Sequence, residues 1–253
     1  MAYGKVLTVP FVGFNGTSYS FDIYQRDYSG EVITRDGCPP AVVIDWGDGA
    51  GEDFATIVGS KATVSFYSET KDEFKLFYAA DKRSYYGELV VNTNKIAWRG
   101  WIVPEQRNER LDYKSVVALT FMDGLGELKN IDFVDDNGDA YMGRASYISI
   151  ISTILAKTGF ELDIYATTGF TGVGVTGDAW GAMYVDQLIY EGLTCAEVLE
   201  QLLLNARMMM VSPALAPAWM IQSLPTLQIF GALDASTSAV STVAVTRYSS
   251  AGV

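Results

Sequence analysis

The sequence predicts an α+β protein that is mostly β, with antiparallel barrel-like or sandwich domains and two main helices packed on the sheets. Short runs of β-forming residues separated by turns fill the first 120 residues, and two later segments carry helix caps and apolar stripes. A hydrophobic fraction of 49% against 19% charged residues is sufficient for a packed core. We expect a β-rich domain over 1–122, an α+β domain over 123–230, and a C-terminal strand or arm over 231–253.

The β-rich part is predicted from alternating polar and apolar residues. The segment from Ser18 to Ile23 alternates in this way, which is typical of a strand with one buried face. Asn15-Gly16 and Thr93-Asn94 lie between candidate strands and have the composition of hairpin turns. The candidate strands are 6–14, 18–24, 31–35, 41–46, 61–67, 88–92, 95–102 and 115–121.

The first helix is predicted over 147–158. Ser146 is a favourable N-cap residue, and Gly159 suits the left-handed conformation that follows a last helical turn. One side of this helix is apolar and should face the core, through Tyr147, Ile150, Ile151, Ile154 and Leu155.

The second helix is predicted from Cys195 to about Arg207. Thr194 and Glu197 have the spacing of a capping box, in which each side chain bonds the other residue's backbone N–H. Its apolar stripe consists of Val198, Leu199, Leu202 and Leu203.

Other segments of the second half have weaker patterns. We expect a strand over 161–165 and an irregular hairpin that joins 208–211 to 218–222. The stretch 167–181 is rich in Gly and Thr and is predicted to be an exposed loop. Residues 235–253 are expected to form a strand with a loose tail, or an arm that pairs with a neighbouring chain.

The absence of histidine restricts the chemistry of the chain. It excludes a Ser-His-Asp triad, a Cys-His pair and any histidine-ligated metal, and two cysteines cannot complete a four-cysteine zinc site. Gly172, Gly174 and Gly177 have the spacing of a dinucleotide-binding loop, but the expected strand and helix do not flank them. We therefore expect no enzyme activity, no cofactor, and no catalytic or metal-binding residue.

The sequence contains two acidic clusters, and the first lies around Trp46. Asp45, Asp48, Glu52 and Asp53 surround Trp46, which would suit a glycosidase with two carboxylates, yet the alternating glycines favour an acidic turn.

The second acidic cluster, 135–139, reads Asp-Asp-Asn-Gly-Asp and offers oxygen ligands of the kind that calcium prefers. Ser146 stands where a calcium loop places its bidentate Glu, so we favour a solvated loop.

The net charge of −12 argues against binding to nucleic acid or to an anionic membrane surface. No run of eighteen apolar residues predicts a membrane span, and the first residues lack the pattern of a secretory signal. Cys38 and Cys195 do not suggest a disulfide framework, and Cys195 is expected to be a buried free thiol. We expect synthesis in the cytosol.

Three further segments have a recognisable order. Residues 98–104 read Trp-Arg-Gly-Trp-Ile-Val-Pro, and 119–129 contain Asp-Gly-Leu followed by Leu-Lys. The capped segment 194–203 follows, and then the candidate strand around Trp219. Physically, Gly100 permits a bulge or a close backbone approach, and Asp123-Gly124 forms a turn after which Leu125 and Leu128 cover the barrel end.

Together these segments resemble tail structural proteins of bacteriophages and prophages, of the baseplate-hub or tail-tip type. The resemblance covers about half of the chain, from Ile96 to about Gln222. It implies a hub-like subunit in the virion tail, made in the bacterial cytoplasm, that forms a trimeric or hexameric ring. Its partners would be other copies of the chain and tail tube, spike or fibre proteins. The long stretch 167–181 and the end soon after the hairpin depart from the family pattern.

Two alternatives remain open at this point. Trp46, Trp98, Trp101 and Trp180 could form a carbohydrate- or receptor-binding module at a tail tip, since tryptophan rings stack on sugars. A glycoside hydrolase would instead need Asp45 and a second carboxylate facing each other in a cleft.

Overall fold

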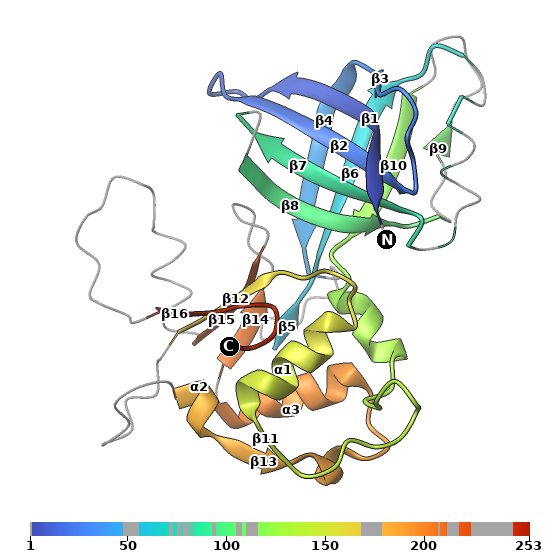
Figure 1. Ribbon diagram of the computed structural model, residues 1–253. Coiled ribbons are helices and arrows are strands. Elements are labelled where there is room, and N and C mark those ends of the chain that lie inside the picture. Colours follow the sequence, from blue (N-terminus) through green and yellow to red (C-terminus); the bar gives the residue numbers. More distant parts are fainter. Residues whose placement is uncertain are drawn as a thin grey trace. The chain divides into compact units, whose positions relative to one another are not determined.

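The computed structural model divides the chain into two compact units, each with its own sheet (Figure 1). The first unit comprises 1–49, 59–123 and 213–217, and the second comprises 50–58, 124–212 and 218–253. The described residues are 2–47, 56–70, 73–74, 77, 81, 83–92, 95–104, 108–109, 116–167, 179–206, 208–211, 218–223 and 245–253.

The first unit is a curled, nine-stranded sheet with the strand order β3-β1-β2-β7-β8-β10-β6-β4, and β9 added on β10. All neighbours are antiparallel except β1 and β3. Pairing among the described residues leaves β3 and β4 at the two ends, so the sheet is sandwich-like and not a closed barrel. Its strands are β1 (Tyr3–Val12), β2 (Ser18–Arg26), β3 (Ile33–Thr34), β4 (Gly37–Trp46), β6 (Ser60–Tyr67), β7 (Tyr85–Val91), β8 (Lys95–Ile102), β9 (Asn108–Glu109) and β10 (Val116–Met122).

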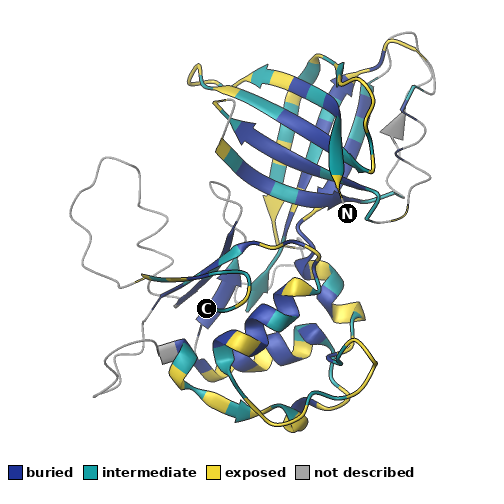
Figure 2. Ribbon diagram, in the orientation of Figure 1, coloured by how far each residue is buried: buried dark blue, intermediate teal, exposed yellow. Residues whose placement is uncertain are grey.

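Alternation along these strands creates the core of the first unit. In β2, Phe21 and Ile23 are fully buried and share one face of the sheet. The same inward face of the neighbouring strands contributes Leu7, Val9, Val64, Phe66, Trp98, Leu119 and Phe121 (Figure 2). The eight strands expected in this part are all present, with shifted ends.

The turns between the strands were predicted with partial success. The β1–β2 hairpin closes at Asn15-Gly16, where Gly16 has a φ of 78° and Asn15 Oδ1 accepts a hydrogen bond from the Thr17 N–H. This prediction is confirmed. Thr93 and Asn94 lie outside the described residues, although β7 and β8 on either side pair antiparallel.

Gly100 allows the close approach expected of it. A Cβ at this position would lie 2.7 Å from the Met122 carbonyl oxygen and would overlap the Trp98 ring. The bulge between β7 and β8 lies elsewhere, opposite Leu89 and Val90. Gly100 therefore permits the close approach of the neighbouring backbone and does not form a bulge.

The second unit is built on a five-stranded mixed sheet with the order β16-β12-β15-β14-β5. The β14–β15 pair is antiparallel, which confirms the predicted hairpin, while β12–β15 and β14–β5 are parallel. A separate two-stranded sheet joins β11 to β13. The strands are β5 (Ile57–Val58), β11 (Arg144–Ser146), β12 (Asp163–Thr167), β13 (Tyr184–Asp186), β14 (Met208–Val211), β15 (Ala218–Ser223) and β16 (Val245–Tyr248).

Two main helices, α1 (Tyr147–Ala156) and α3 (Cys195–Ala206), pack against each other, and α3 also contacts β14. Ser146 caps α1 by accepting a hydrogen bond from the Ser149 N–H, and Gly159 follows with a φ of 82°. Thr194 and Glu197 form the predicted capping box, since the Thr194 N–H donates to Glu197 Oε2 and the Glu197 N–H donates to Thr194 Oγ1. Both helices, and the mostly β fold class, are confirmed.

Three details differ from the sequence-based expectations. Ile148 is buried on α1, whereas Tyr147 is half-buried. Leu125 and Leu128, expected over the barrel end, are buried in the 3₁₀ helix η2 (Leu125–Asn130) of the second unit, which contacts α3.

The third difference lies in a longer segment. The end of the expected loop 167–181 is the short helix α2 (Ala179–Ala182), with Trp180 fully buried, and 168–178 lie outside the described residues. Of the two alternatives for the C-terminal residues, a strand or an arm to a neighbouring chain, the described part forms the strand, since β16 is hydrogen-bonded to β12 of the same chain. Residues 235–244 are not among the described residues.

Gly100→Ala should lower the free energy of unfolding by about 1–3 kcal/mol, because an added methyl has no space between the Trp98 ring and the Met122 carbonyl. Ser65→Ala, at a half-buried position of β6, is the control and should change it by less than about 0.5 kcal/mol. Urea denaturation of the full chain measures both. Equal effects of the two substitutions would contradict the close packing at Gly100.

Candidate interaction surfaces

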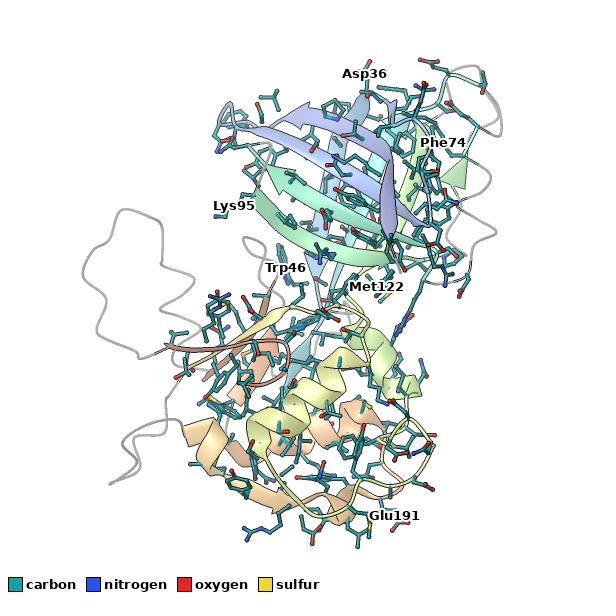
Figure 3. All side chains as sticks on the ribbon, viewed as in Figure 1. Asp36, Trp46, Phe74, Lys95, Met122 and Glu191 are labelled. Carbon is teal, nitrogen blue, oxygen red and sulfur yellow. The ribbon has the colours of Figure 1, made fainter. Side chains whose placement is uncertain are left out.

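The four tryptophans considered as a sugar-binding platform do not form one. Trp98, Trp101 and Trp180 are 1%, 6% and 0% exposed, so their rings cannot stack on a ligand from solvent. Only Trp46 of the four is exposed, at the end of β4 (Figure 3). The prediction of a four-tryptophan platform is therefore wrong, because three of the rings are used for packing.

The acidic cluster around Trp46 is described only in part. Asp45 lies opposite Lys61 in the β4–β6 ladder, and Gly47 turns the chain with a φ of 82°. Asp48, Glu52 and Asp53 lie outside the described residues. The glycosidase hypothesis, which needs one of them as its second carboxylate, therefore stays an untested prediction.

The second acidic cluster is a tight turn held by its own first carboxylate. Asp135 Oδ1 accepts hydrogen bonds from the backbone N–H groups of Asn137 and Asp139, at 2.8 and 2.9 Å. These bonds stabilise the ionised carboxylate and lower the pKa of Asp135. Gly138 completes the turn with a φ of 87°. Among the described residues, no three potential metal-ligating side chains come together.

The most developed polar cluster lies on the outer face of the first sheet, opposite its apolar core. Arg99 on β8 donates from Nε and Nη2 to Glu88 Oε1 on β7, and Glu88 is 4% exposed. Lys5 Nζ lies 2.6 Å from Asp22 Oδ2, and the Asp22 residue is 3% exposed. Both acids thus carry a basic partner from a neighbouring strand.

Stacked aromatic rings join these two ion pairs. Tyr24 and Tyr86 stack with ring centroids 4.8 Å apart, and the Arg99 guanidinium lies 5.5 Å from the centre of the Tyr86 ring. Burial, reinforced by the charge of Glu88, raises the pKa of Tyr86 to about 12 and raises the pKa of Tyr24 as well. Both phenols therefore stay protonated at neutral pH, and the cluster is suited to stiffening the sheet and not to proton transfer.

Sequence reasoning missed this outer-face cluster. Its signal was present, since Asp22 and Tyr24 on β2 and Tyr86 and Glu88 on β7 occupy the alternate, polar positions of their strands. The register that places Tyr24 beside Tyr86 is a long-range property that no local pattern encodes.

A second buried polar network ends strand β10. Asp123, 2% exposed, accepts hydrogen bonds from the Ser60 N–H at 2.6 Å and from the Ser60 hydroxyl at 2.8 Å. The Ser60 hydroxyl in turn accepts a hydrogen bond from the Trp98 indole N–H at 2.8 Å. This chain of bonds joins β6, β8 and β10 inside the first unit.

One polar cavity of about 680 Å³ lies beside Arg35 and Tyr67 in the first unit. Among the described lining residues the one cation is Arg35, which is bonded to Glu73 and lies 3.5 Å from Glu69, so its charge is balanced by these two acids. The remaining lining is Thr34, Asp36, Ser68 and Thr70, which makes it an unpromising site for an anion.

Two exposed apolar surfaces stand out, one in each unit (Figure 2). We name the first the hairpin tip. It is the β1–β2 turn with Val12 (70% exposed) and Phe14 (112%).

The second, the β11–β13 patch, consists of Met142, Tyr184, Leu188 and Ile189, which are 72%, 57%, 43% and 64% exposed. Large apolar side chains gathered at the surface commonly mark protein contacts.

Within the described part of the chain, no helix combines the length and apolar character that crossing a bilayer requires.

Arg99→Ala should cost about 3 kcal/mol of stability, because it leaves the buried Glu88 carboxylate without its basic partner. Arg247→Ala is a matched control, since Arg247 also donates Nε and Nη2 to one carboxylate oxygen, of Asp163, but is 65% exposed. Arg247→Ala should destabilise the protein much less than Arg99→Ala, because solvent screens an exposed ion pair. Equal losses in chemical denaturation would show that burial of the Glu88 pair has no energetic weight.

A maleimide should label Cys38 in the folded chain and leave Cys195 unlabelled until the protein unfolds. Cys38 is half-exposed, whereas Cys195 is fully buried and burial raises the pKa of its thiol to about 11. Mass spectrometry of native and urea-treated protein counts the labels, and Cys38→Ser should remove the native one. Labelling of Cys195 as fast as Cys38 would contradict its burial.

No family model matches the chain, and no curated protein matches it. Among solved structures, the chain is similar to the 43 kDa tail protein of prophage MuSo2 from Shewanella oneidensis. The two are 11% identical, with a TM-score of 0.39, over 72% of this chain and 53% of the tail protein. The chain thus spans about half the length of that protein.

Proposed function

We propose that this chain is a structural protein of a bacteriophage or prophage tail, without enzyme activity. The observation that carries the proposal is the ordered set of three segments described from the sequence, at 98–104, 119–129 and 194–203. Each segment lies where it determines the local geometry of the fold.

The first segment forms most of β8 and brings two tryptophans to opposite faces of the first sheet. Trp98 packs into the core beside Phe21, whereas Trp101 packs beside Tyr3 and Tyr86 on the outer face. Gly100 between them lets the backbone of β10 approach. The segment therefore specifies how the sheet is assembled.

The second and third segments fix the ends of elements. Asp123 ends β10 through its bonds to Ser60, and Gly124 follows with a φ of 92°. The capping box of Thr194 and Glu197 begins α3, which leads into the β14–β15 hairpin. Residues that determine the shape of the fold in this way are suited to a protein whose role is to present contact surfaces.

In its finer form the proposal is a baseplate-hub or tail-tip subunit. It would form a trimeric or hexameric ring that joins the tail tube to the host-facing end and contacts tube, spike or fibre proteins. The exposed apolar surfaces of both units are consistent with such contacts. The carbohydrate-binding alternative is not retained, because three of its four tryptophans are buried.

Electron microscopy of particles should place the chain at one end of the tail tube. An affinity tag inserted after Gly138, in an exposed turn with open space around it, can be labelled with gold-conjugated antibody. Untagged particles are the control. Label on the capsid, along the whole tube, or only on free protein in the lysate would contradict the proposed position.

A further inference from the structure

We propose that the hairpin tip of one copy docks on the β11–β13 patch of the next copy, as the head-to-tail contact of the ring. This inference rests on the proposed ring and names the two surfaces that would close it. It follows from the exposure of both surfaces and from the distribution of charge around them.

The β11–β13 patch is continuous by register. Arg144 lies opposite Asp186 and Ser146 opposite Tyr184 in the two-stranded sheet. The Gln187 N–H then donates to the Gly143 carbonyl, which brings Met142 beside the 3₁₀ helix η3 (Gln187–Tyr190). This helix carries Leu188 and Ile189. The four apolar residues of the patch therefore come from backbone segments that adjoin one another.

The segments that carry the patch are rich in carboxylates, and Lys157 at the end of α1 lies 3.9 Å from one of them, Asp136. Asp186 and Glu191 flank η3, and the turn with Asp135, Asp136 and Asp139 leads into Met142. Arg144 is the only basic residue within these two segments, 134–146 and 184–192. Figure 3 labels Glu191 at this end of the second unit.

The surrounding charge decides which surface can cover the patch. A two-fold contact of patch on patch would bring together two second units, each with a net charge of −10 from 15 acidic and 5 basic residues, which like-charge repulsion disfavours. The partner surface must therefore be apolar and poor in acids. A contact between two different surfaces is heterologous, and such contacts generate rings when the rotation closes.

The hairpin tip fits this requirement within the same chain. Phe14 has the highest exposed fraction among the exposed large hydrophobic residues, and the segment 9–21 around it contains no charged residue. The register aligns Tyr19 with Val91 and Val91 with Lys95, so the nearest charge two strands away is positive. Phe11 stacks on Tyr19 beneath the tip, with ring centroids 5.4 Å apart, which supports the turn.

The whole chain shows the same asymmetry. The second unit has 15 acidic and 5 basic residues, a net charge of −10, whereas the first has 15 acidic and 13 basic residues, a net charge of −2. A contact that pairs the first unit of one copy with the second unit of another therefore meets less repulsion than a contact between two second units.

Cross-linking of mixed variants tests the contact directly. One full-length protein carries Phe14→Cys and the other, larger through a tag, carries Ile189→Cys, both with Cys38→Ser. A short bismaleimide should join the two species into one covalent pair, and because each carries a single new thiol, the link must be between chains. Leu204→Cys is the matched control for Ile189→Cys, since Leu204 is 57% exposed on α3, outside the patch.

Charge substitutions at the tip supply a second measurement. Asn15→Asp keeps the side-chain oxygen that accepts from Thr17 but places an acid against the acidic patch, and should raise the self-association Kd at least threefold. Glu191→Gln should restore part of the affinity to Asn15→Asp. Phe14→Ser should raise the Kd about tenfold or more, against little change for Val32→Ser, at 46% exposure. Sedimentation velocity measures each Kd.

Each opposing outcome has a definite meaning. Cross-links of Phe14→Cys to Leu204→Cys as strong as those to Ile189→Cys, or a chain that stays monomeric at all concentrations, would overturn the contact between copies. The second result would assign both surfaces to other proteins. A ring without the cross-link removes this inference and leaves the tail function, whereas a cross-link in a protein located outside the tail removes the function alone.

Discussion

The buried carboxylate of Asp123 is the constraint on which the order of the first sheet depends. A carboxyl group that is 2% exposed is tolerable only with hydrogen-bond partners, and Ser60 supplies two, from its N–H and its hydroxyl. Since Ser60 begins β6, Asp123 follows β10, and Trp98 donates to Ser60 from β8, a shift of any of these strands would break the network. A slip of one residue would also turn the apolar side chains of the strand to the opposite face, so the core and this network specify the same register.

The outer-face cluster applies the same principle to the other side of the sheet. Asp22 and Glu88 are nearly inaccessible although they lie opposite the core, because Lys5, Arg99 and the tyrosine stack cover them. Replacing these ion pairs with apolar side chains would leave a large apolar face on an acidic protein. The pairs therefore combine a stiff sheet with a face that is polar toward solvent. A sheet made rigid on both faces is a suitable support for a hairpin that extends beyond it.

The elements that could be predicted from the sequence are those whose ends depend on interactions between residues close together in the chain. The capping box of Thr194, the N-cap of Ser146 and the turn at Gly16 each act over three or four residues, so the corresponding elements were located within a few positions. The parallel pairing of β12 with β15, and the two residues of β5 on β14, join segments far apart in the chain and leave no local pattern. The burial of the tryptophans could not be predicted for a related reason. Alternation shows that Trp98 and Trp101 face opposite sides of a strand, but not that both sides are covered.

The candidate contact surfaces could be predicted from the sequence only by composition, because exposure depends on what the fold leaves uncovered. Ile189 and Leu199 have similar side chains and both lie on helical turns, yet Leu199 is fully buried and Ile189 is 64% exposed. Burying Ile189 and its neighbours within the unit would stabilise the isolated chain, at about 25 cal/mol for each Å² of apolar surface removed from water. In the fold as described they stay exposed, beside carboxylates that discourage contact between identical surfaces. In the proposed contact between copies, an apolar patch beside carboxylates favours an acid-poor surface of the next copy over a second patch of the same kind.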